Sequence, residues 1–121
     1  MNWNRRVLLA LGPILTAAGL AGLAWPDSIS LSSSATPYDI FHIAFGTLGT
    51  ALAIAGKPRK IAAFNLVFGV IDLWQAVASV VGLPPTTLFA LRPADHVIHV
   101  VLGVFLAWLG ATGLVKNSAG A

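Results

Sequence analysis

Three histidines and an aspartate are the residues of this chain whose types and spacing could do chemistry. Asp39 lies three positions before His42, and His96 lies three positions before His99, so on a helix each pair shares one face. Imidazole and carboxylate groups bind Zn or Cu, and facing histidines in a helical bundle can hold haem b. The spacing raises two hypotheses: a metal site made by all four residues, and haem ligation by His42 and His99.

Asp72 is a second candidate, because it is an ionisable residue near the middle of an apolar segment. A charge at such a position costs about 3 kcal/mol or more, so an intramembrane carboxylate is a candidate functional site. Its expected partners are Gln75 and the hydroxyls of Thr16, Thr47 and Thr50. One interpretation is a neutral carboxyl group that is hydrogen-bonded inside the bundle. The other is a small proton- or solute-conducting element centred on Asp72.

The same polar groups also have a structural interpretation. Asp39 and Asp95 lie near the expected starts of helices, where a carboxylate accepts hydrogen bonds from free N–H groups and meets the positive end of the helix dipole. The histidines would then be satisfied by these neighbours and by loop backbone. The chain has no Cys, no Glu, no H-E-x-x-H motif and no glycine-rich phosphate loop. Catalysis is therefore not expected.

The elements that position these residues must lie in lipid. Of 121 residues, 57% are hydrophobic and only 9% are charged, which is too little charge to coat a water-facing domain. The length allows one domain, residues 1–121. The net charge of +3 does not indicate nucleic-acid binding, because the basic residues are few and stand between apolar segments.

Four apolar segments reach the roughly 20 residues that a helix needs to cross a bilayer. They run over about 7–25, 38–56, 61–83 and 94–115, and proline, charge or both separate them. The first segment follows Arg5 and Arg6, as a signal peptide would. We expect it to be a retained span, because its apolar run is longer than a typical signal core.

Basic residues set the expected orientation. Six of the seven Lys and Arg residues flank the segments on one side, and only Arg92 lies on the other. By the positive-inside rule, both termini and the turn at Lys57–Lys60 are expected in the cytoplasm. The chain is thus predicted to be a multi-pass protein of the plasma (inner) membrane.

The two halves of the chain resemble each other at an offset of 57 positions. His42 then matches His99, and Gly46 matches Gly103, within one ungapped register. Two similar helical hairpins crossing in the same sense form a parallel repeat. We predict an all-α integral membrane four-helix bundle, with glycine stripes that allow close helix packing. The stripes contain Gly46, Gly49, Gly103 and Gly110.

Two short motifs carry a resemblance to a known group of proteins. They are Asn65-Leu66-Val67-Phe68-Gly69 and the segment from His96 to Gly103, with the pattern H-V-x-H-x-x-x-G. Together they resemble an uncharacterised family (a domain of unknown function) of small bacterial four-helix integral membrane proteins. The resemblance extends over roughly residues 6 to 115. It implies the architecture and assigns no activity.

Three functions remain open from the sequence. The first is an accessory, structural or partner-binding membrane protein, surrounded by the lipid bilayer as a homo-oligomer or as part of a larger complex. The second is a haem- or metal-binding protein that uses the histidines. The third is the conducting element centred on Asp72.

Overall fold

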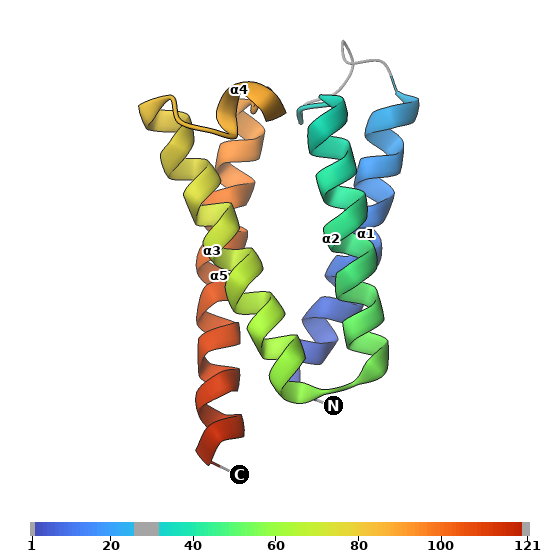
Figure 1. The fold of residues 1–121 in the computed structure, drawn as a ribbon, viewed down its shortest axis with the longest axis vertical. Helices are drawn as coiled ribbons and strands as arrows, with labels where there is room; N and C mark the ends of the chain where they lie inside the picture. Colours follow the sequence, from blue (N-terminus) through green and yellow to red (C-terminus); the bar gives the residue numbers. More distant parts are fainter. Residues whose placement is uncertain (1, 26–31, 120–121) are drawn as a thin grey trace.

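The chain folds into helices in the computed structural model, which describes residues 2–25 and 32–119. The helices are α1 (Trp3–Ala24), α2 (Thr36–Ala55), α3 (Pro58–Val81), α4 (Thr86–Phe89) and α5 (Pro93–Ala119) (Figure 1). All except α4 are long and apolar enough to cross a membrane. The prediction of an all-α chain with four apolar spans is confirmed. The short helix α4 lies between the third and fourth predicted segments.

Proline residues begin the helices rather than separate them. Pro58 and Pro93 are the first residues of α3 and α5, and Pro37 is the second residue of α2. Proline suits the first turn, where its missing N–H has no helical partner to lose. The predicted starts at 38, 61 and 94 are therefore slightly too late. At their other ends α2 and α3 stop at Gly56 and Gly82, whose φ angles of 70° and 72° favour glycine.

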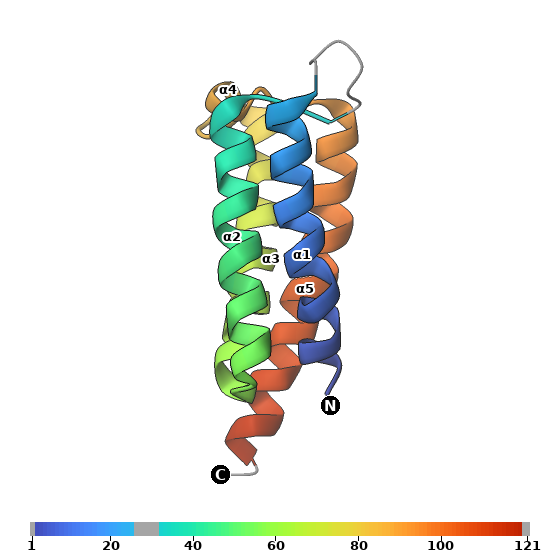
Figure 2. The same cartoon turned by 90° about the vertical axis from the view of Figure 1, so that its right-hand side faces the viewer.

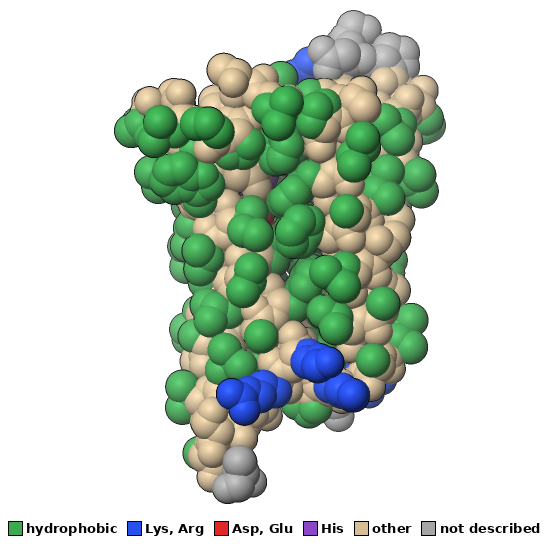
Figure 3. All heavy atoms as spheres, viewed as in Figure 1, with side chains coloured by type: hydrophobic (Ala, Val, Ile, Leu, Met, Phe, Trp, Pro, Cys, Tyr) green, Lys and Arg blue, Asp and Glu red, His purple; other side chains and the backbone are tan. Residues whose placement is uncertain are grey.

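The four long helices form two antiparallel hairpins. Helix α1 packs along α2, and α3 packs along α5, whereas contacts between the two pairs are sparser (Figures 1 and 2). The first and last described residues lie at the same end of the bundle as the α2–α3 turn, and α4 lies at the opposite end. We call these the basic end and the loop end. The basic end carries Arg5, Arg6, Lys57, Arg59, Lys60 and Lys116 (Figure 3).

In each hairpin, a pair of glycines lies where the two helices cross. A Cβ added at Gly12 of α1 would lie 3.0 Å from the carbonyl oxygen of Gly46 on α2, and a Cβ at Gly46 would lie 2.7 Å from that of Gly12. The second hairpin repeats this crossing: the matching distances are 2.9 Å from Gly69 to Gly103 and 3.0 Å from Gly103 to Gly69. The backbones thus approach too closely for any side chain, as in other small-residue helix contacts in membranes.

The glycine stripes lie at helix contacts, but the two stripes do not face each other. Gly46 faces α1, while Gly103 and Gly110 face α3 of their own hairpin. Gly49 faces a different neighbourhood, since a Cβ there would lie 2.9 Å from Leu8 and 3.1 Å from the Phe64 ring. The small residues therefore close the hairpins, and larger side chains join one hairpin to the other.

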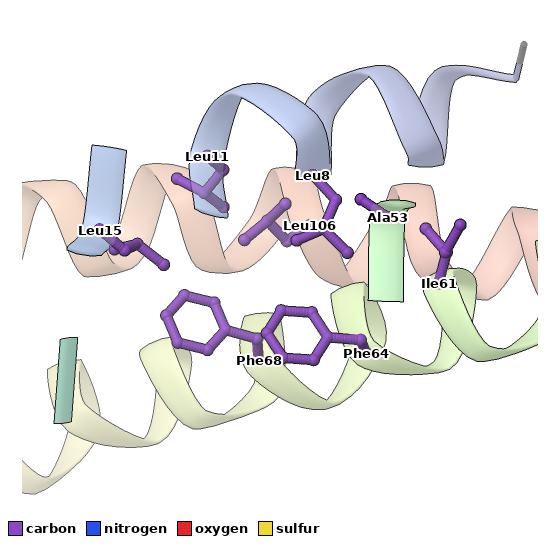
Figure 4. Close-up of a cluster of buried hydrophobic side chains, with 8 residues drawn as sticks. All are labelled: Leu8, Leu11, Leu15, Ala53, Ile61, Phe64, Phe68 and Leu106. Atoms are coloured by element: carbon purple, nitrogen blue, oxygen red, sulfur yellow. The ribbon is translucent and has the colours of Figure 1, made fainter. Parts of the chain in front are cut away.

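An apolar core fills the space between the hairpins from the basic end to the middle of the bundle (Figure 4). The Phe68 ring stacks on Phe41 at 6.0 Å and lies 5.4 Å from Phe45, so the core continues onto α2. The core residues are Leu8, Leu11, Leu15, Ala53, Ile61, Phe64, Phe68 and Leu106.

The outer surface is as apolar as the core. Large side chains such as Ile54, Val80 and Trp108 are more than half exposed along the long helices. Figure 3 shows hydrophobic side chains over the height of the visible face, with Lys and Arg gathered at the basic end. Such a surface is suited to hydrocarbon and not to water.

Buried amides join three helices at the basic end. The Asn65 amide donates to the side-chain oxygen of Asn4 at 2.9 Å and to its backbone oxygen at 3.2 Å, and the Asn4 amide donates to the carbonyl of Leu109 at 2.9 Å. Arg5 also donates from Nε to the carbonyl of Ala53 at 2.8 Å. These bonds fix the start of α1 against the other three long helices.

Replacing Asn65 with leucine is expected to weaken this junction. The substitution removes both bonds to Asn4 and leaves the Asn4 Oδ1 acceptor buried, so the free energy of unfolding should fall by about 1 kcal/mol. Reversible unfolding in mixed detergent micelles measures this change. Val67→Leu on the exposed face of the same helix is the control, and an equal stability of the two variants would contradict the prediction.

Candidate functional site

The most connected polar group of the described residues is the Asp95 carboxylate, in the first turn of α5. Its Oδ2 atom accepts a bond from the backbone N–H of Arg92 at 2.9 Å, which caps the start of the helix. The same oxygen accepts the N–H of Ser33 at 2.9 Å, and Oδ1 accepts the Ser32 hydroxyl at 2.5 Å. Asp95 thus binds the segment that precedes α2, and it is only 1% exposed.

Further bonds hold the loops of the two hairpins together. The Ser33 hydroxyl donates to the carbonyl of Phe89 on α4 at 2.5 Å and accepts the N–H of Ala35 at 3.2 Å. The Arg92 guanidinium donates to the carbonyl of Ser32 at 3.3 Å. Loop-end segments that lie some 60 positions apart in the chain are therefore tied to each other by side chains.

Tyr38 connects this loop cluster to the interior of the bundle. Its ring is 2% exposed, and its hydroxyl lies 3.3 Å from Asp95 Oδ1 and 2.8 Å from His99 Nε2. The phenol has one proton, so it donates to one neighbour at a time, and the tautomer of His99 sets the direction of the other bond. Asp95, Tyr38 and His99 form a series of hydrogen bonds that crosses from α5 to α2 and back.

The structure brings His42 and His99 to the same tyrosine ring. The centroid of Tyr38 lies 4.2 Å from that of His42 and 5.9 Å from that of His99. The expected convergence of one histidine from each half is present, but a phenol stands beside both imidazoles where haem was hypothesised. His99 Nε2 is also engaged by the Tyr38 hydroxyl. The arrangement therefore does not support haem ligation by His42 and His99.

The four residues predicted as metal ligands do not come together. Asp39 faces α1 of its own hairpin, where a Cβ on Gly22 would collide with its carboxylate. His96 is half-buried and lies beside Val97, Val100 and Val101 on α5. Among residues 2–25 and 32–119, no group of three His, Cys, Asp or Glu side chains could hold a metal ion. The described residues therefore give no support to the metal site hypothesised for Asp39, His42, His96 and His99, and that site stays a hypothesis.

Asp72 and Gln75 are buried on α3, at 2% and 1% exposure, on the stripe that carries Phe68. The threonines expected to reach Asp72 bond within their own helices instead. Thr16 donates to the carbonyl of Gly12, Thr47 to Ile43 and Ala44, and Thr50 to Gly46. Asp72 therefore lacks the threonine partners expected for it among the described residues.

Tyr38 was not predicted as a site residue, and Asp95 was predicted only as a helix cap. The sequence did contain a signal for both, because Tyr38 and Asp95 are separated by the same 57 positions at which the two halves of the sequence resemble each other.

The cluster offers a carboxylate, a phenol and an imidazole in series, which can hold or shift a proton between oxygen and nitrogen atoms. Its geometry shows chiefly connections between the hairpins. Comparisons with protein-family models, with curated proteins and with solved structures give no match to this chain.

Proposed function

We propose that this chain is a small multi-pass membrane protein with an accessory, partner-binding role rather than a catalytic one. The observation that carries the proposal is the use of its interior polar groups. Asp95, Tyr38 and His99 bond to one another and to the loops, and at the basic end Asn4 and Asn65 bond to each other and to α5. Because these polar groups join the two hairpins, we infer that the molecule acts through its apolar outer surface.

We further propose that the bundle is a parallel repeat of two hairpins. Helix α3 ends 57 positions after α1, and α5 begins 57 positions after α2. The Gly12–Gly46 and Gly69–Gly103 crossings are related by the same offset and have nearly equal distances. The resemblance to an uncharacterised four-helix family, carried by segments 65–69 and 96–103, agrees with this architecture.

The orientation that we propose places the basic end in the cytoplasm, at the inner face of a bacterial plasma membrane. Fluorescent-protein and alkaline-phosphatase fusions to the C-terminus test it in a bacterial host. The fluorescent fusion should be bright and the phosphatase fusion inactive, because the positive-inside rule keeps the Lys57–Lys60 turn and both termini on that side. An active phosphatase at the C-terminus would contradict this topology.

Two measurements on protein purified in mild detergent test the accessory role against cofactor binding. The absorption spectrum should lack a Soret band, and metal analysis should find no stoichiometric Zn or Cu. Native electrophoresis of membranes from the source organism should show the chain in an assembly larger than the purified protein alone. A stoichiometric haem or metal that is lost in the double variant His42→Ala and His99→Ala would overturn the proposal. Migration as a single chain only would overturn the partner-binding role.

Conduction by one copy of the chain has weaker support. The apolar core between Leu8 and Phe68 separates Asp72 from the polar groups of the basic end. A path across the membrane through one bundle would have to pass this core, so the chain lacks the continuous polar line that a proton relay needs.

A further inference from the structure

In the part of the chain that the structure describes, buried polar atoms without a hydrogen-bond partner lie in the loop-end half of the interior, except for Oδ1 of Asn65 at the basic end. Gln75 is 1% exposed, and neither its amide nitrogen nor its amide oxygen meets a hydrogen-bond partner among the described residues. The same holds for Nδ1 of His99, whose side chain is 3% exposed. Leaving such a group dry costs about 1–3 kcal/mol, so three of them in one region need an explanation.

These atoms lie at one depth. His99 and Gln75 are each six positions from the loop-end terminus of their helix, which corresponds to about 9 Å along the axis. Asp72 lies nine positions from the end of α3, about 14 Å deep. The unpartnered groups therefore form a layer in the outer third of the bundle, and Asp72 lies one helical turn below it.

The groups also face the same space between the hairpins. His99 reaches across to Tyr38 on α2, and Phe68 reaches across to Phe41 and Phe45 on α2. Asp72 and Gln75 follow Phe68 by four and seven positions, which places them on the same face of α3. His99 and Gln75 thus flank the region that Tyr38 enters.

The apolar core closes this region toward the basic end, and the region lies nearer to the loop end of the bundle. The apolar core from Phe68 to Leu8 lies between Asp72 and the basic end of the bundle (Figure 4). His42 is only half-buried, and acidic and histidine atoms are visible in the seam between the two halves of the bundle (Figure 3). A small polar molecule entering from the loop-end side would meet the unpartnered groups before it met the core.

We propose that this region is a hydrated inlet, open from the loop-end side of the membrane and ending at Asp72. Its ligand is water, because a water molecule can donate and accept and thereby satisfies the Gln75 amide, His99 Nδ1 and the Asp72 carboxyl group together. Each buried water needs two to four polar partners, and this layer supplies them. The inlet gives Asp72 aqueous access from one side only, and this inference is independent of the proposed accessory role.

Cysteine accessibility tests the inlet directly, because the chain contains no native cysteine. Gln75→Cys and Asp72→Cys place a thiol in the layer and at its floor, and Ala53→Cys places one in the apolar core at 0% exposure. Each variant is reconstituted in liposomes and treated with a small, charged, membrane-impermeant methanethiosulfonate on one side at a time. Residual thiols are counted by the mass shift with a maleimide polymer after denaturation.

The inlet predicts modification of both polar-layer thiols from the loop-end side, at least about tenfold faster than Ala53→Cys, because a thiol reacts as a hydrated thiolate. From the basic-end side all three should react equally slowly. If the thiols of Gln75→Cys and Asp72→Cys were modified as slowly as that of Ala53→Cys from both sides, the proposal would be overturned.

A measurement on the unaltered chain covers the case in which a variant does not fold. A water-soluble carbodiimide with an amine nucleophile should label Asp72 from the loop-end side, as read by peptide mass spectrometry. An unlabelled Asp72 under conditions that label the denatured protein would also overturn the inlet.

Discussion

Asp95→Ala is expected to lower the free energy of unfolding by about 3 kcal/mol or more. The substitution leaves four donors without their acceptor: the Ser32 hydroxyl, the backbone N–H groups of Ser33 and Arg92, and in part the Tyr38 hydroxyl. The carboxylate is almost fully buried, so water cannot simply replace it. Denaturant titration in mixed micelles, followed by circular dichroism, measures the loss.

Two further variants sharpen this test. Asp95→Asn keeps one side-chain oxygen as an acceptor and should lose about half as much stability as Asp95→Ala. Thr47→Ala removes an exposed hydroxyl that bonds only within its own helix, so its effect should stay within about 0.5 kcal/mol. If Asp95→Ala were as stable as Thr47→Ala, the loop-end cluster would not hold the hairpins together.

Gly69→Leu is expected to separate α3 from α5, again with a loss of about 3 kcal/mol or more. The first added carbon would lie 2.9 Å from the Gly103 carbonyl oxygen and 3.0 Å from Ala107 Cα, and closer still to the Ala107 nitrogen. All three atoms belong to backbone, which cannot move aside as a side-chain tip can. The hairpin must open, and the buried amides at the basic end lose their alignment with it.

Val70→Leu provides the matched control, since this neighbour of Gly69 is 53% exposed and the substitution places the same leucine side chain on the outer surface. Gly12→Leu tests the equivalent crossing of the first hairpin and should behave like Gly69→Leu. Equal denaturation midpoints for Gly69→Leu and Val70→Leu would show that the close crossing contributes nothing to stability.

Much of the fold could be predicted from composition and spacing alone. Apolar runs of about 20 residues and their basic flanks indicate four spans. They are expected to be helical because backbone polar groups in hydrocarbon must be hydrogen-bonded within the segment. The starts of α2, α3 and α5 were placed too late, since a proline such as Pro58 was taken as a break when it also fits the first turn of a helix. Element boundaries depend on such local details.

The candidate site was harder to predict, because a helical face does not reveal which neighbour it meets. His42 and His99 do converge, yet their shared partner is Tyr38, which spacing alone did not single out. Asp39 was expected on the same helical face as His42, yet its carboxylate turns toward Gly22 of α1. Residues three positions apart differ in direction by roughly 60° around a helix. Whether each of the two side chains then lies inside or outside the bundle is decided by the packing of the neighbouring helices.

The pairing of Tyr38 with Asp95 makes the two hairpins non-interchangeable. These residues are 57 positions apart, which is the offset of the repeat that we propose. In such a repeat, a dimer of two first hairpins would set phenol against phenol, and a dimer of two second hairpins would set carboxylate against carboxylate. Only the mixed combination lets a hydroxyl meet its acceptor. If the chain were cut at the Gly56–Pro58 turn and its halves were produced together, the first half should associate with the second half. Neither half should form a dimer with a copy of itself.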